Sequence, residues 1–97
     1  MTPYTKEKYY LAIMSIGQSA KPPANRLADA WIFHLMHAQR EANSDEIVDV
    51  LEQLAEAFSE VENPEIGSAH ASANEWDDEK VRRVAELFAA ISLKSED

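Results

Sequence analysis

The chain has 97 residues, a formal net charge of −9 at pH 7 and 45% hydrophobic residues, which is enough apolar material to exclude wholesale disorder. It has no cysteine, which excludes disulfides and thiolate sites, and only two glycines, which excludes a glycine-rich phosphate-binding loop. The excess of carboxylates argues against nucleic acid or an anionic membrane as a direct partner.

The first predicted helix covers about residues 3–16. Thr2 is placed to cap its N-terminus, and Pro3 occupies the first helical position, where its missing N–H costs nothing. Gly17 and the Lys-Pro-Pro sequence that follows end this helix. Its apolar run is shorter than the roughly 18–20 residues of a membrane span, and it fits a signal peptide badly. We therefore expect a cytoplasmic protein.

The second predicted helix covers about residues 24–42, and the third covers about residues 44–61. Asn43 separates the two helices, and Glu46 stands three residues later, which is the spacing of a capping box. The third helix has the most regular apolar stripe of the chain: Ile47, Leu51, Leu54, Phe58 and Val61.

Residues 62–74 are predicted to form a long loop, because they are small, polar and without periodicity. The fourth helix then covers about residues 75–93. No segment shows the alternation of a strand or the turn signal of a hairpin. The sequence therefore predicts one all-α domain over residues 1–97, an antiparallel four-helix bundle with a long loop between helices three and four.

Apolar residues surround the first helix almost completely, and the second helix carries some on the far side of its main stripe. A small bundle encloses no helix on all sides, so another surface should cover these residues. We predict a homodimer, although a folded-back loop or oblique helix crossing would also cover them. The predicted dimer interface consists of Tyr9, Tyr10, Ile13, Ile32, Phe33 and Met36.

Charge is divided unevenly along the chain. Residues 1–42 carry five basic and three acidic side chains, a net charge of +2. Residues 43–97 carry four basic and fifteen acidic side chains, a net charge of −11. Between residues 44 and 79 there are twelve carboxylates and no lysine or arginine.

The third predicted helix has a stripe of carboxylates opposite its apolar stripe, at a spacing where like charges repel. The fourth helix, in contrast, is expected to pair Asp78 with Arg82 and Glu79 with Arg83. Breaking a local rule in this way is typical of a functional surface, although an acidic protein also uses such a face for solubility. The stripe consists of Asp45, Asp49, Glu52, Glu56 and Glu60.

A row of carboxylates on a rigid helix steers basic partners. We therefore predict a non-enzymatic module without a cofactor, which covers a basic surface of a partner protein, either a basic patch or a nucleic-acid-binding channel. Small phage and plasmid inhibitors, antitoxins, immunity proteins and DNA mimics share this short, acidic, helical profile. The predicted partner contacts are Asp45, Asp49, Glu52, Glu56, Glu60, Ile66, His70 and Trp76.

Two alternatives remain open. Asp45, Glu46 and Asp49, together with Glu75 and Asp78, resemble the E-E-x-x-E and E-x-x-D motifs of MazG-type nucleotide pyrophosphohydrolases. That resemblance implies an all-α, oligomeric enzyme whose carboxylates hold Mg²⁺ against a nucleoside triphosphate. The other alternative is a homo-oligomeric scaffold or assembly protein, in which the apolar faces carry the function and the charge only maintains solubility.

Overall fold

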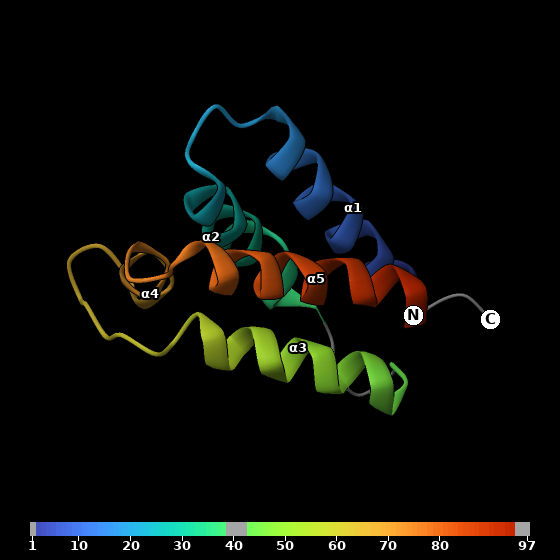
Figure 1. The fold of residues 1–97 in the computed structure, drawn as a ribbon. Coiled ribbons are helices and arrows are strands. Elements are labelled where there is room, and N and C mark those ends of the chain that lie inside the picture. The colour runs from blue at the N-terminus through green and yellow to red at the C-terminus, as the bar shows by residue number, and fades with distance from the viewer. Residues whose placement is uncertain (1, 39–42, 95–97) are drawn as a thin grey trace.

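The structure, a computed structural model, describes residues 2–38 and 43–94 and is all-α, as predicted. The expected four-helix bundle is not confirmed, because the described residues form five α-helices and one 3₁₀ turn (Figure 1). In chain order these are α1 (Pro3–Gln18), α2 (Pro23–Phe33), the 3₁₀ turn η1 (Leu35–His37), α3 (Asp45–Ala57), α4 (Ser68–Asn74) and α5 (Asp78–Lys94).

The additional helix, α4, lies inside the segment 62–74 that was expected to be a loop. It has seven residues, too few to show a clear apolar period. The turn before it depends on Asn63, whose Oδ1 accepts the backbone N–H groups of Glu65 and Ile66. Gly67 follows with a φ of 88°, a conformation that glycine adopts without strain. The side chains that α4 buries are all small: Ala69, Ala71, Ser72 and Ala73.

α2 is shorter than predicted and ends at Phe33. His34 leaves the helical region with a φ of −132°, and the chain continues as η1, which buries Leu35 completely. No glycine or proline marks this end, so the sequence carries no local signal for it. Residues 39–42, the last part of the predicted helix, lie outside the described residues.

The N-terminus of α1 follows the prediction, because the Thr2 hydroxyl accepts the Thr5 N–H at 3.2 Å. The predicted cap of α3 is wrong by one residue: the N-cap is Ser44, whose hydroxyl accepts the Ile47 N–H at 3.4 Å. The Asn43 side chain instead joins the two helix starts. Its Oδ1 accepts the Thr2 N–H at 2.9 Å, and its Nδ2 donates to the Thr5 hydroxyl at 3.0 Å.

The helices pack as two pairs, with α4 placed against α2. α1 and α2 form a helical hairpin, and α3 and α5 lie side by side in opposite directions (Figure 1). α3 and α5 supply most of the large side chains that have no contact with solvent. The largest of these core residues are Leu35, Ile47, Leu51, Leu54, Phe88 and Ile91.

Phe58, at the C-terminal end of α3, joins these pairs through an aromatic cluster. Its ring stacks on Trp31 of α2 with 5.6 Å between the ring centroids. It also lies 5.1 Å from the Trp76 ring, just before α5, and 6.5 Å from Phe88 within α5. Such pairs add about 0.5–1.5 kcal/mol each beyond the burial of apolar area.

We predict that Phe58→Ala lowers the free energy of unfolding by about 3–5 kcal/mol, because it leaves a cavity in this cluster. The same substitution at Phe33, a ring that is 62% exposed, is the matched control and should change it by less than about 0.5 kcal/mol. Urea unfolding followed by tryptophan fluorescence measures both variants. Equal effects at the two positions would contradict the packing described here.

Candidate functional site

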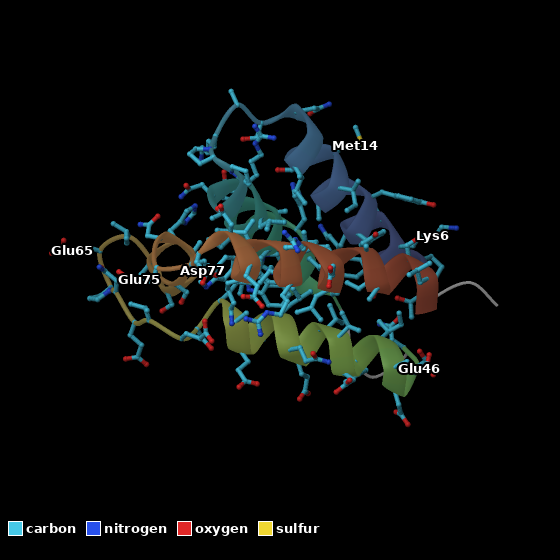
Figure 2. The ribbon with its side chains drawn as sticks, in the orientation of Figure 1. Lys6, Met14, Glu46, Glu65, Glu75 and Asp77 are labelled. Carbon is cyan, nitrogen blue, oxygen red and sulfur yellow. The ribbon has the colours of Figure 1, made fainter. Side chains whose placement is uncertain are left out.

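α3 presents a row of exposed carboxylates, which we call the acidic face: Asp45, Asp49, Glu52 and Glu56. The side chains of α3 that do not pack on α5 extend into solvent, as the labelled Glu46 shows (Figure 2). Among the described residues, none of these carboxylates has an ion-pair partner within 4.0 Å. Asp49 accepts one hydrogen bond, from Gln53 Nε2 at 3.0 Å.

Glu60, predicted to extend this stripe, lies beyond the end of α3 and is paired. The Lys80 ammonium of α5 is 3.1 Å from its carboxylate. Lys80 and Arg83 also line, with Glu56, a cavity of about 210 Å³ between α3 and α5. On the flank of α3 that faces α5, the negative charge of Glu60 is therefore balanced by Lys80.

The ion pairs predicted within the last helix do not form. Neither Asp78 with Arg82 nor Glu79 with Arg83 comes within 4.0 Å in the part of the chain that the structure describes. Arg83 instead lines the α3–α5 cavity. Lys80 and Arg83 of α5 thus lie against α3.

The other flank of α3 borders an apolar groove of about 520 Å³. Its floor includes the stacked rings of Trp31 and Phe58. It is hollow because α3 and α4 contribute small side chains, which leave the space that larger ones would fill. The residues that line the apolar groove are Trp31, Ile32, Met36, Ala55, Phe58, Ser59, Gly67, Ser68 and Ala69.

A buried carboxylate holds α4 against α2. Asp29 of α2 is only 7% exposed, and its two oxygens accept hydrogen bonds from Lys21 Nζ at 2.6 Å and from His70 Nε2 at 2.8 Å. Burial alone raises the pKa of the Asp29 carboxyl, but the hydrogen bonds and charges of Lys21 and His70 outweigh it and hold the pKa below its ordinary value.

This cluster changes the role expected for His70. The sequence analysis placed His70 in a loop as a partner contact, whereas the structure places it on α4 with its ring committed to Asp29. Sequence reasoning missed Asp29 altogether. Its signal was a single acid within the apolar run of α2, between Ala28 and Ala30, where an unpaired charge is costly.

The two remaining predicted partner contacts differ in exposure. Ile66 is exposed in the turn before α4 and lies next to Gly67 of the apolar groove. Trp76 is half-buried against Phe58, and its indole Nε1 is buried without a hydrogen-bond partner among the described residues. Trp76 is therefore mainly a packing residue.

The residues predicted to form a dimer interface separate into three groups. Tyr9 is 7% exposed and belongs to the core, where burial raises the pKa of its phenol in spite of a hydrogen bond with Ser92. This ring already packs within the chain and offers little surface to a second copy. Ile32 and Met36 line the apolar groove. The remaining three, Tyr10, Ile13 and Phe33, are exposed outside the apolar groove.

α1 nevertheless exposes a continuous apolar surface, which we call the outer face of α1. Its five large side chains are between 37% and 55% exposed. Lys6 and Lys8 lie over the rings of Tyr10 and Tyr4, which adds a basic margin to this surface. The outer face of α1 consists of Tyr4, Tyr10, Leu11, Ile13 and Met14.

The carboxylates that resemble the pyrophosphohydrolase motifs do not converge. Glu46 lies at one end of the α3–α5 pair, whereas Glu75 lies at the other end, where α5 begins with Asp78, because the two helices run in opposite directions (Figure 2). Within the described residues, no group of three or more histidine, aspartate or glutamate side chains could hold a metal ion. The geometry of the single chain therefore gives this alternative no support.

Comparison of the chain with protein-family models, with curated proteins and with solved structures finds no match. Among the described helices, none combines the length and the apolar character that crossing a bilayer requires.

Asp29 should make the stability depend on pH. Because its pKa is lowered in the folded state, its contribution is complete above the ordinary value of 3.8 and is lost as the pH falls through the lower folded-state pKa. We predict that Asp29→Asn is less stable than the wild type at pH 7, and that the difference shrinks below about pH 3.8. Urea unfolding between pH 2 and pH 7, at roughly unit steps, measures this. A difference that is constant over this range would contradict the assignment.

Proposed function

We propose that this protein is a protein-interaction module that uses the acidic face of α3 to bind a basic surface of a partner protein. The observation that carries the proposal is the absence of ion-pair partners for the acidic face among the described residues. The other flank of α3 supports it, since there the chain supplies Lys80, which pairs with Glu60.

The physical role of the acidic face is electrostatic steering followed by occlusion. Adjacent carboxylates on one side of a helix raise the local negative potential, which increases the association rate of a basic partner and is screened by salt. Because these carboxylates form no ion pair with another described residue, no internal ion pair has to be broken before a partner binds.

The test compares two triple variants with the same change in net charge. In the first, Asp49→Asn, Glu52→Gln and Glu56→Gln neutralise the acidic face; in the second, Asp78→Asn, Glu79→Gln and Glu86→Gln neutralise exposed acids of α5. Tagged proteins are used to capture partners from lysate at low and high salt, with mass spectrometry of what is retained.

We expect one basic protein to be retained by the wild type and the α5 variant, and to be lost with the α3 variant or at high salt. The α3 variant itself should fold and gain a few tenths of a kcal/mol at low salt for each repulsive pair removed. Equal retention by both triple variants would refute the proposal, because binding would then not depend on whether the neutralised carboxylates lie on the acidic face or on α5.

A second candidate function, self-association, is supported by the outer face of α1. Contiguous apolar surfaces of this kind are uncommon on monomers. α1 and α3 lie on opposite sides of α5 in the view of Figure 1, so a second copy on α1 leaves the acidic face accessible. The expected product is a homodimer with two acidic faces.

We predict that Ile13→Lys with Met14→Lys converts the dimer into a monomer, because each substitution places a charge in an apolar contact. Leu93→Lys is the matched control, since Leu93 is 74% exposed near the end of α5. Sedimentation equilibrium measures the mass of each protein. A monomeric wild type, or a dimer that survives the double substitution, would refute self-association through α1.

A further inference from the structure

The apolar groove between α2, α3 and α4 has the dimensions of a binding site. Its volume of about 520 Å³ lies within the range of pockets that enclose ligands. The stacked rings of Trp31 and Phe58 provide a rigid apolar floor. Met36 at its edge is exposed and flexible, and methionine adapts its shape to a bound apolar group. The groove therefore suits a large apolar side chain.

The surroundings of the apolar groove are negative. The segments that line it span residues 31–36 and 55–69, which hold four carboxylates and no lysine or arginine, and one of the four, Glu60, is paired with Lys80. Glu52 lies one helical turn before the α3 residue that lines the groove, and Glu62 and Glu65 lie in the segment that leads to α4. All three carboxylates are exposed. An occupant with positive charge beside its apolar group would complement both features.

We propose that the apolar groove receives a large apolar side chain of a basic partner protein, carried on an amphipathic helix whose lysines or arginines flank that side chain. This inference rests on the proposed function and adds the point of attachment: the acidic face steers the partner, and the groove holds it. Helices that lay an apolar face into a groove bind in this way. Charge disfavours the acidic part of a second copy as the occupant, because residues 43–97 carry a net charge of −11.

The test uses three synthetic helical peptides of equal length and isothermal titration calorimetry. The first carries leucines along one face and lysines elsewhere, the second replaces the leucines by serines, and the third replaces the lysines by glutamates. We expect the lysine–leucine peptide to bind at least about tenfold more tightly than either of the others. The methyl resonances of Ile32 and Met36 should shift only with this peptide.

The decisive test is a variant in which a larger side chain fills the apolar groove. Ala55→Met places a longer side chain in the groove and keeps a good helix former in α3. Ala89→Met, on the exposed side of α5, is the matched control. We expect Ala55→Met to weaken the lysine–leucine peptide about tenfold or more and to leave the weak lysine–serine binding unchanged. The control should leave both unchanged.

The outcomes separate this inference from the proposed function. The lysine–leucine and lysine–serine peptides could bind equally well, and both could lose binding in the double variant Glu52→Gln, Glu56→Gln. This result would overturn the role of the apolar groove and retain the role of the acidic face. Tight binding of the glutamate–leucine peptide would overturn the charge complementarity and with it both proposals. A groove occupied by a second copy would appear as a dimer that Ala55→Met dissociates, and this too would overturn the inference.

Discussion

Phe58 packs against rings from three other parts of the chain, Trp31 in α2, Trp76 before α5 and Phe88 in α5. Because it is the residue at which α3 ends, it fixes the position of that end against both neighbouring helices. The chain must then turn away from the core, and α4 forms in the segment that follows. The distance between α2 and α3, which sets the width of the apolar groove, is therefore maintained by the same aromatic contact that closes the core.

The electrostatics of the surface follow from where this packing places the basic residues. Lys80 and Arg83 lie between α3 and α5, so they balance one flank of α3 and leave the other unbalanced. Lys21 is engaged with the buried Asp29. As a result, the acidic face and the apolar groove border a common region from which positive charge is missing. The acidic face that steers a partner is consequently adjacent to the apolar groove that holds it, so one partner helix can contact both.

The sequence predicted the features that depend on local pattern: the all-α class, the capped start of α1 and the apolar and acidic stripes of α3. It could not predict α4, because small buried side chains give no periodic signal, or the end of α2, which no helix breaker marks. The candidate site also has features that follow from local pattern and features that depend on tertiary packing. The exposed carboxylates were evident from spacing, whereas the pairs Glu60–Lys80 and Asp29–His70 join residues far apart in the chain and depend on tertiary packing.

The central claim is that the acidic face and the apolar groove act together as one binding surface. Amide chemical shifts of the ¹⁵N-labelled protein, recorded during titration with the lysine–leucine peptide at low and high salt, test it most directly. The account predicts that the shifts concentrate in residues 31–36, 52–59 and 66–69 and diminish at high salt. Shifts centred on α1, or spread evenly over the acidic residues of α3 and α5, would contradict it.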